Sequence, residues 1–467
     1  MSEQLEDILS RQRGAFLAQG APSLAQRRAT LRRLRALVLA RRPQIEAAVS
    51  ADFGHRARHE TAAMEILTVL KGIDYLHRNL RRFMRPEKRH VEIVFRSGRA
   101  RIEYQPLGVV GIVAPWNYPF SLAMMPLATA LAAGNRAMIK PSEFTPQTSA
   151  LLQAMLGEIF AQEEVAVTLG DGALGAAFCA LPFDHLLFTG SPQVGRAVMK
   201  AASANLVPVT LELGGKSPAI VASGHANGRA ASSIAYGKLS NAGQTCVAPD
   251  YVLVHESDRD AFVAAYDEAV AALYPRGPAS ADYTSILNDR HYLRLKSLLD
   301  DAAARGARIV EVGVRPADAA SRAHTLAPTL VLHVTDDMAI MREEIFGPVL
   351  PIRTYRDIAE AIAYVNANPR PLALYYFGEE GSECREVLAR TTSGNVGVNN
   401  TLLHVAQDDL PFGGVGNSGI GAYHGIEGFR AMNHAKGIFV QGRWNAANML
   451  RAPFGRIADL TLAFLLR

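Results

Sequence analysis

Apolar residues recur every three or four positions through the first part of the chain. Two such series are Leu31, Leu34, Val38 and Ile66, Val69, Leu70, Ile73. This spacing places each series on one face of a helix. We therefore expect residues 3–82 to be helical and to pack against the outside of the first domain.

Residues 86–104 follow a different pattern, in which apolar and polar positions alternate on both sides of Ser97 and Gly98. An alternation of period two around a glycine-containing turn predicts a β-hairpin. We expect this hairpin to leave the domain, where it is a candidate arm for bridging subunits.

From Leu107 onwards, short apolar runs alternate with helical segments. The run PLGVVGIVA predicts a buried strand of parallel type, and the apolar helical stretch after it ends at Gly134-Asn135. The elements expected next are a strand at AMIK, a helix over 146–160, and strands over 165–169 and 184–188. Such alternation predicts a doubly wound α/β domain that binds ligands at the carboxyl ends of its strands.

A second α/β unit follows residue 246. Its expected elements are strands over 251–255, 308–312, 328–334 and 372–377 and helices over 259–274 and 292–304. Residues 394–400 begin a segment that returns towards the first unit. The fold class expected is therefore α/β, with a doubly wound domain, a second α/β domain and a small β arm.

The composition is that of an ordinary globular protein, with 49% hydrophobic and 20% charged residues in a chain of 467. The N-terminus is charged and lacks the apolar core of a signal peptide, so we expect a cytoplasmic protein. The net charge of +5 is not accompanied by a recognised nucleic-acid module, so no nucleic-acid partner is expected. Three cysteines without paired spacing predict neither a disulfide framework nor a zinc site, and we expect no metal.

Two residues have the surroundings that catalysis requires. Glu212 is the only charge in an apolar strand over 207–213 that breaks at Gly214-Gly215, as expected for a general base with a raised pKa. Cys246 lies in a loop between a helix and a strand, where its sulfur would be exposed. The thiol needs a pKa below the ordinary value of about 8.5 to act as a nucleophile at neutral pH. Taken alone, a cysteine is more often a small core residue.

Taken together, the motifs LELGGKSP and GQTC around these two residues resemble the paired catalytic signatures of the NAD(P)-dependent aldehyde dehydrogenases. The other matches to that family are PWNYP at 115–119, IKPSE at 139–143, FTGS at 188–191, EEIFGP at 343–348 and PFGGVGNSG at 411–419. The ending PFGGVGNSGIGAYHG resembles the class 3 branch, and the whole chain most resembles the bacterial group within that branch that acts on coniferyl aldehyde.

The resemblance implies a division of the chain into functional parts. These are an NAD(P)-binding domain over 1–85 and 105–212, a catalytic domain over 213–393, oligomerisation segments over 86–104 and 394–440, and an amphipathic tail over 441–467. The partners that it implies are a small-molecule aldehyde and a second copy of the chain in a homodimer.

The resemblance also implies a reaction, the oxidation of an aldehyde to the carboxylic acid. The Cys246 thiolate would form a thiohemiacetal, whose oxyanion the Asn117 amide and the Cys246 backbone N–H would stabilise. Loss of hydride to the cofactor would leave a thioester, which water activated by Glu212 would hydrolyse. A thiol esterase that uses the same Cys246 and Glu212, or a non-catalytic binding protein, are the alternatives.

The cofactor expected is NAD, with NADP as a possibility that stays open. The residues that the resemblance assigns to the cofactor are Lys140, Glu143, Gly190, Ser191, Gly195, Glu344, Phe346 and Trp116. Glu143 would repel a 2′-phosphate, which favours NAD. GDGALG at 170–175 fits the dinucleotide fingerprint, but no acidic residue follows at the required distance, and the resemblance places this loop near the adenine instead. Taken alone, FTGS is equally a turn capped by Ser191.

Substrate information comes from one helical face. Tyr118, Leu122 and Met125 stand at i, i+4 and i+7, and the resemblance places them along the aldehyde tunnel. Such a face suits an aromatic or medium-chain aliphatic aldehyde and does not suit a charged semialdehyde, which would need an arginine. A stripe like this is also typical of plain core.

The C-terminal tail ends in a short amphipathic helix with an apolar run over 460–466. This run is far shorter than the about 20 residues that a membrane span requires. The helix could bind a lipid surface or pack on protein. We favour packing on the body of the chain or on a partner subunit, and do not expect a membrane partner.

Overall fold

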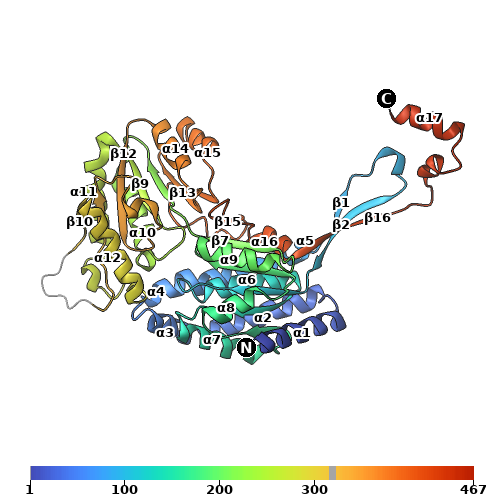
Figure 1. Cartoon of the computed structure of the whole chain (residues 1–467), viewed down its shortest axis with the longest axis horizontal. Coiled ribbons are helices and arrows are strands. Elements are labelled where there is room, and N and C mark those ends of the chain that lie inside the picture. The colour runs from blue at the N-terminus through green and yellow to red at the C-terminus, as the bar shows by residue number, and fades with distance from the viewer. Residues whose placement is uncertain (1, 315–321, 467) are drawn as a thin grey trace.

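The computed structural model describes residues 2–314 and 322–466. These residues form two α/β lobes, each built on its own sheet, and a third, small sheet that extends away from the lobes as an arm (Figure 1). The predicted α/β fold class is confirmed.

The first lobe contains a six-stranded sheet with the order β15-β7-β6-β3-β4-β5. Its strands are β3 (Val109–Val113), β4 (Arg136–Lys140), β5 (Val165–Val167), β6 (His185–Gly190), β7 (Val209–Leu213) and β15 (Gly419–Ile420). β3 to β7 are parallel, and β15 pairs antiparallel with β7. The central strands are continuous apolar runs because helices cover both faces of the sheet.

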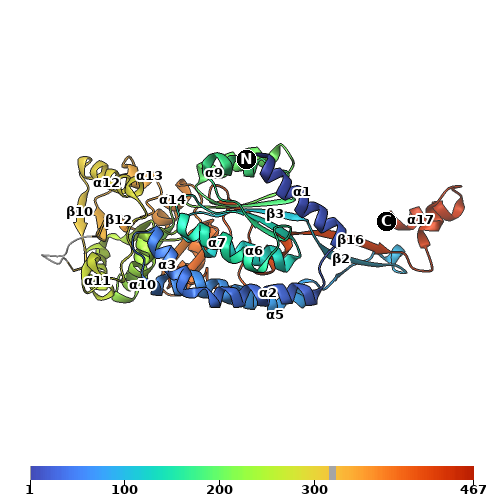
Figure 2. The ribbon, with the colours of Figure 1, turned by 90° about the horizontal axis from the view of Figure 1, so that it is seen from below.

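Two groups of helices cover this sheet, as Figure 2 shows. On one face lie α1 (Ser2–Gln19), α8 (Gly172–Cys179) and α9 (Pro192–Ser203). On the other lie α6 (Ser121–Ala133) and α7 (Pro146–Ile159), with α2 (Leu24–Ala40) and α5 (Thr68–Phe83) outside them. The expected helical N-terminal region is therefore present, and α2 and α5 pack on the outside of the first lobe as predicted.

The second lobe contains a seven-stranded sheet with the order β10-β11-β12-β9-β8-β13-β14. Its strands are β8 (Pro218–Val221), β9 (Tyr251–His255), β10 (Arg308–Glu311), β11 (Thr329–Leu332), β12 (Val349–Tyr355), β13 (Ala373–Phe377) and β14 (Asn395–Val398). Its helices are α10 (Gly228–Leu239), α11 (Arg259–Leu273), α12 (Asp289–Ala304), α13 (Ala339–Arg342), α14 (Ile358–Ala367) and α15 (Ser382–Arg390). Only β10 is antiparallel to its neighbour among these strands.

The arm contains the hairpin predicted over residues 86–104. β1 (Glu87–Arg89) pairs antiparallel with β2 (Arg99–Pro106), and β16 (Asn433–Val440) pairs with the other edge of β2. Because β16 follows α16 (Gly425–Ala431), which packs on the first lobe, the arm is tied to that lobe at two points of the chain.

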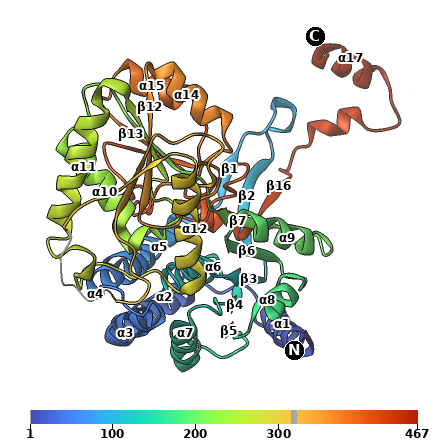
Figure 3. The same cartoon turned by 60° about the vertical axis from the view of Figure 1, so that its left-hand side comes forward.

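The tail leaves the end of β16 and lies beyond the arm, away from both lobes (Figures 1 and 3). Its terminal helix α17 (Arg456–Leu465) packs against the short helix η6 (Ala446–Leu450). The described part of the tail therefore does not pack on the body of its own chain, and that part of the prediction is wrong. No helix among the described residues is long and apolar enough to cross a membrane.

Candidate active site

Glu212 lies on β7 between two neighbouring strands, opposite Thr189 of β6 and Gly419 of β15. It is only 3% exposed, and neither carboxylate oxygen has a hydrogen-bond partner among the described residues. Burial raises the pKa of Glu212 well above its ordinary value. A buried carboxyl without donors is held neutral, and becomes a strong base once it loses its proton.

Cys246 lies on a sharply bent loop that follows α10. Asn241 and Ala242 both adopt left-handed conformations, with φ of 53° and 51°. Gly243 follows with φ of 77°, and a Cβ at this position would collide with the carbonyl of Gly347. Three consecutive left-handed residues turn the chain so tightly that Cys246 is placed at the junction of the two lobes.

Asn117 reaches this loop from the other lobe. It is 3% exposed, and its side-chain amide donates to the backbone carbonyl of Gln244 at 3.1 Å. The backbone carbonyl of Asn117 accepts from the side chain of Asn241 at 2.9 Å. These bonds hold Asn117 against Gln244, which stands two positions before Cys246 in the chain. They leave the second N–H of the Asn117 side-chain amide for a ligand.

Two separate cavities border Cys246. One, of about 230 Å³, is lined by Pro115, Trp116, Asn117, Thr189, Gly190, Ser191, Glu212, Gly214, Cys246, His291, Arg294, Glu344 and Phe346. The other, of about 280 Å³, is mostly apolar and shares with the first only Cys246 among its described lining residues. A thiol with a cavity on each side can contact two different ligands at once.

The first cavity brings together most of the residues expected to hold the cofactor. Trp116 faces Phe346, with ring centroids 5.3 Å apart, and also His291, at 4.6 Å. The Glu344 carboxylate accepts from the backbone N–H of Gly215 at 3.1 Å, and a Cβ at Gly214 would collide with it. Aromatic faces beside a buried carboxylate fit a ribose and a planar ring, so these residues fit a nicotinamide nucleotide.

Lys140 and Glu143 lie outside this cavity and form an ion pair of 2.7 Å. Next to them lies the GDGALG loop, whose Asp171 caps α8 by accepting from the backbone N–H groups of Ala173 and Leu174. A Cβ on Gly175 would contact the Lys140 side chain, and one on Gly172 the Glu143 carboxylate. The GDGALG loop therefore lies within contact distance of the pair.

Ser191 is the N-cap of α9, and its hydroxyl accepts from the backbone N–H of Val194 at 3.4 Å. The capped-turn interpretation of FTGS is therefore correct for the structure without ligands. Gly195 packs against Leu213, where a larger side chain would collide. The free N–H groups in the first turn of α9 remain available to a phosphate.

The second cavity is lined by all three residues predicted for the aldehyde tunnel, Tyr118, Leu122 and Met125. The Tyr118 hydroxyl lies 2.8 Å from the hydroxyl of Thr245. The wall residues to which the sequence analysis gave no role include Met64, Tyr236, Val247, Leu402, Leu403, Val405, Phe412, Tyr423 and His424. They come from segments far apart in the chain, so no local spacing could have found them.

The pKa of the Cys246 thiol is raised to about 12, first by burial and then by the carboxylates of Glu344 and Glu212. The expected lowering of this pKa is therefore not observed. Cys179 and Cys384 are both buried and lie away from these cavities, as expected of structural cysteines. No cluster suited to a metal ion occurs within residues 2–314 and 322–466.

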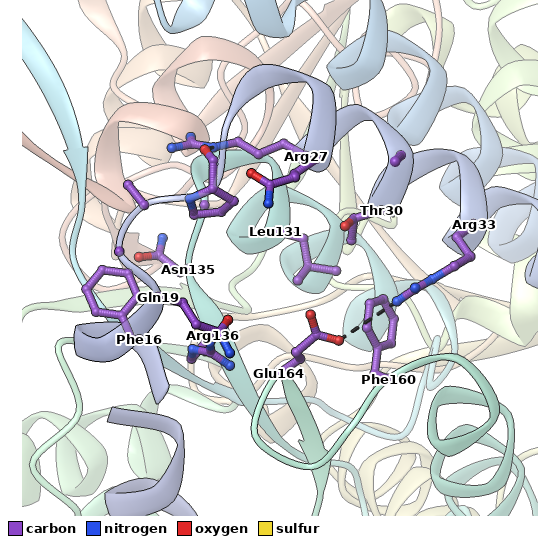
Figure 4. Close-up of a pocket in the computed structure, with 16 residues that line it drawn as sticks. Phe16, Gln19, Arg27, Thr30, Arg33, Leu131, Asn135, Arg136, Phe160 and Glu164 are labelled. Atoms are coloured by element: carbon purple, nitrogen blue, oxygen red, sulfur yellow. Dashed lines mark hydrogen bonds and ion pairs between the residues drawn. The ribbon is translucent and has the colours of Figure 1, made fainter. Parts of the chain in front are cut away.

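A third hollow, of about 340 Å³, lies at the far end of α6 and is unrelated to these residues (Figure 4). Arg27 donates there to the backbone carbonyls of Ala132 and Ala133, which end the helix. Arg33 pairs with Glu164 at 3.8 Å. The polar groups of this hollow therefore serve the helix end and each other.

The chain was compared with known proteins. It matches the aldehyde dehydrogenase family over residues 1–438. It is 51% identical to a probable coniferyl aldehyde dehydrogenase of Pseudomonas aeruginosa, over 97% of this chain and 94% of the relative. It is 48% identical to the coniferyl aldehyde dehydrogenase of Pseudomonas sp., over 100% of this chain and 97% of the relative. The substrate-bound AldH of Staphylococcus aureus is 37% identical, with a TM-score of 0.92 over 98% of this chain and 99% of that one.

These matches extend over both lobes, so they include every strand that surrounds Cys246 and Glu212. They agree with the resemblance carried by the short motifs, most of which contribute residues to the two cavities, with IKPSE outside them. The chain belongs to the aldehyde dehydrogenase family and is an NAD(P)-dependent aldehyde dehydrogenase.

Proposed function

We propose that this enzyme oxidises an aromatic aldehyde of the coniferyl type, with medium-chain aliphatic aldehydes as the second substrate class, through covalent catalysis at Cys246. The observation that carries the proposal is the position of Cys246 between two cavities, one lined by the predicted tunnel residues and the other by most of the predicted cofactor residues. An aldehyde in the apolar cavity presents its carbonyl carbon to the sulfur on one side and releases hydride on the other. A bound nicotinamide supplies the hydride acceptor that side chains lack.

In the covalent step, the Cys246 sulfur adds to the carbonyl carbon, and the thiol proton passes to the Glu212 carboxylate. The thiohemiacetal oxyanion accepts hydrogen bonds from the Asn117 amide and the Cys246 backbone N–H. Since burial raises the pKa of both Cys246 and Glu212, the proton is exchanged between two groups that each disfavour charge. This is the arrangement in which a thiol is activated by an adjacent base as it attacks.

After hydride loss has produced the thioester, Glu212 releases the thiol proton to solvent and then acts a second time. Its carboxylate takes a proton from a water molecule, the oxygen adds to the thioester carbon, and the carbon–sulfur bond breaks. The carboxylic acid leaves and Cys246 is restored. The absence of hydrogen-bond donors to Glu212 among the described residues supports this role, because nothing else stabilises its anion.

NAD is the proposed cofactor. Trp116, Glu344 and Phe346 would contact its nicotinamide half, and the N-terminus of α9 its phosphates. Lys140 and Glu143 would contact the adenosine ribose, where the Glu143 carboxylate repels a 2′-phosphate. The position of Glu143 beside the GDGALG loop supports this assignment.

The substrate class rests on the second cavity. Aromatic side chains of Tyr118, Phe412 and Tyr423 occur in its lining, and no Arg or Lys does among the described residues. An uncharged ring therefore fits, and a carboxylate does not. The names of the two Pseudomonas relatives point to the same class.

The arm formed by β1, β2 and β16 is the proposed contact between subunits of a homodimer. β1 leaves an unpaired strand edge at one side of this sheet, as expected of a surface that a second chain extends or covers. Cofactor binding is assigned to the first lobe and the nucleophile to the second. Residues 394–440, which the resemblance assigns to oligomerisation, contribute β14 to the second lobe, β15 to the first and β16 to the arm.

The test is a comparison of kcat/KM for coniferyl aldehyde, cinnamaldehyde, benzaldehyde, hexanal and succinic semialdehyde with NAD and with NADP. We expect the cinnamyl aldehydes to lead, the semialdehyde to be last, and NAD to be preferred. A preference for the semialdehyde would refute the substrate class. Ester hydrolysis without any NAD(P) binding would favour the esterase alternative.

A further inference from the structure

The segment over residues 53–67 does not follow the expectation that the N-terminal helices lie outside the first domain. It contains the short helix α4 (Arg58–Glu60) and a π-helix, η1 (Thr61–Leu67). The side chains of Arg56 and Glu65 are both 0% exposed. This segment reaches the two loops that carry Asn117 and Cys246.

Arg56 contacts the first of these loops. Its Nη1 donates to Glu65 Oε1 at 2.8 Å and to the backbone carbonyl of Asn117 at 3.3 Å. Its guanidinium also lies over the ring of Tyr118, 4.7 Å from the centroid. One buried cation therefore touches both the proposed oxyanion donor and the wall of the aldehyde cavity.

Glu65 holds the helix that continues from this loop. Its Oε2 accepts from the backbone N–H groups of Phe120 and Ser121, at 2.8 and 3.0 Å. These are the first free donors of α6, which carries Leu122 and Met125 into the aldehyde cavity. A carboxylate is stabilised at this end of a helix.

Glu60 holds the second loop. Its Oε1 accepts from the backbone N–H of Asn241 at 2.9 Å, and its Oε2 from the hydroxyl of Thr284 at 2.5 Å. Asn241 is the left-handed residue that starts the turn towards Cys246, and its side chain donates to the carbonyls of Asn117 and Gln244. Glu60 therefore supports the residue that ties the two loops together.

The π-helix explains how Glu60 and Glu65 act on the same site. In an α-helix of about 3.6 residues per turn, side chains five positions apart point in different directions. The wider π turn bonds residue i to i+5, so positions five apart come onto one side. Arg56 lies between them, 2.8 Å from Glu65 and 4.0 Å from Glu60.

We propose that Arg56, Glu60 and Glu65 are positioning residues for aldehyde oxidation, which hold the Asn117 amide and the Cys246 loop in register across the two lobes. The inference rests on the proposed function of Cys246 and Asn117. Oxyanion donors act only if they are in place before the charge forms. A displacement of about 1 Å at such a site can lower the rate about 100-fold.

Glu60 gives the sharpest test, because two substitutions separate its roles. Glu60→Ala removes the acceptor for Asn241 and is expected to lower kcat about 100-fold with the KM for NAD unchanged. Glu60→Gln keeps an oxygen for the Asn241 N–H and an amide for the Thr284 hydroxyl. It is expected to restore kcat to within a few-fold of wild type.

The matched control uses the two ends of α6. Glu65→Gln weakens the cap at the end beside Cys246, whereas Arg27→Met removes the bonds to Ala132 and Ala133 at the far end. Both are expected to lower the melting temperature, but only Glu65→Gln should lower kcat. These variants keep the inference testable if Glu60→Ala does not fold.

The results are read from kcat, the KM for NAD and thermal melts of the full-length enzyme. A Glu60→Ala enzyme with wild-type kcat would overturn the inference, as would an Arg27→Met enzyme that loses kcat as much as Glu65→Gln at equal melting temperature. Wild-type enzyme that produces no NADH from any aldehyde would instead overturn the proposed function, and the inference with it.

Discussion

The two cavities that meet at Cys246 are of similar size, about 230 and 280 Å³, but they are built in opposite ways. The cofactor-side cavity is formed by loops at the ends of β3, β6 and β7 and by the segment around Glu344. The aldehyde-side cavity is formed by helix faces and by loops over residues 402–424. Both linings are mostly apolar, but the first also contains two carboxylates, those of Glu212 and Glu344, and the second contains none among the described residues.

The two cavities therefore differ in what they require of their side chains. One needs particular hydrogen-bonding groups, whereas the other needs only a surface of suitable shape. A phosphate or a ribose requires particular donors at particular points, which glycines and a capped helix provide. An apolar ring requires only a surface of the right volume, which many combinations of side chains supply. Single substitutions in the cofactor-side cavity should therefore change cofactor binding and leave aldehyde binding intact. Substitutions in the aldehyde-side cavity should change aldehyde binding and leave cofactor binding intact.

Loss of the shared residue has the largest expected effect, because it breaks the connection between the cavities. Cys246→Ser should lower kcat by at least about 10³-fold, since an alcohol is far less nucleophilic than a thiolate. NAD affinity, measured by fluorescence titration, should not change because the cofactor-side lining is otherwise intact. A variant that keeps a tenth of the wild-type kcat would contradict the assignment of the nucleophile.

Glu212→Gln should separate the two chemical steps that the cavities serve. Hydride loss continues, but the thioester is hydrolysed slowly without a base, so rapid mixing should show a burst of NADH followed by a slow steady state. The burst is expected provided that hydride transfer remains the faster step. Equal losses in burst and steady state would mean that Glu212 acts only earlier, as the acceptor of the thiol proton, and not as the deacylation base.

The pH dependence of deacylation should report the same residue. A general base works only when deprotonated, and burial raises the pKa of Glu212 above its ordinary value. The steady-state rate in the wild type should therefore rise with pH through this raised pKa, on the alkaline side of 4.5, and fall as the carboxyl is protonated. In Glu212→Gln the steady-state rate should lose this rise, and a profile unchanged from wild type would assign it to another group.

Blocking one cavity should leave the other unchanged. Leu122→Trp adds bulk to the aldehyde side and should raise the KM for cinnamaldehyde about tenfold, equivalent to about 1.4 kcal/mol, without changing the KM for NAD. Glu344→Gln should do the reverse. Steady-state kinetics with each substrate varied would measure both, and a change in both KM values for either variant would show that the cavities are coupled.

The cofactor side could be predicted from the sequence because its residues stand in short motifs that are continuous along the chain. Trp116, Ser191 and Phe346 each lie within a motif, and the structure places all three on one cavity. His291 and Arg294, on the same cavity, belong to α12 and stand in no such motif. They reach this cavity through the tertiary packing of α12, which places the His291 ring 4.6 Å from the ring of Trp116.

The residues that hold the Asn117 and Cys246 loops were the part of the site hardest to predict from the sequence. Arg56, Glu60 and Glu65 look like ordinary charges on a solvated helix, and charged residues are rarely fully buried. Their burial depends on a π turn and on loops more than 50 positions later in the chain. The elements themselves were easier: most strands and helices lie within two residues of their expected limits, since apolar runs and Gly or Pro breaks are local signals.

The tail should have the smallest effect on chemistry, because it lies far from both cavities. Ile457, Leu460 and Phe464 are 66%, 72% and 75% exposed, so the described part of a single chain does not bury this apolar surface. Burying it against a partner subunit would stabilise a dimer by about 25 cal/mol for each Å² of apolar area. Deletion of residues 456–467 should therefore shift the sedimentation profile towards monomer or lower the melting temperature. The kcat for benzaldehyde should stay within about twofold of wild type, as expected for a change away from both cavities.

A change in KM confined to bulky aldehydes would place the tail at the partner's cavity mouth. If the full-length enzyme instead co-sediments with anionic liposomes and the truncated enzyme does not, the apolar face binds lipid and the subunit contact is wrong.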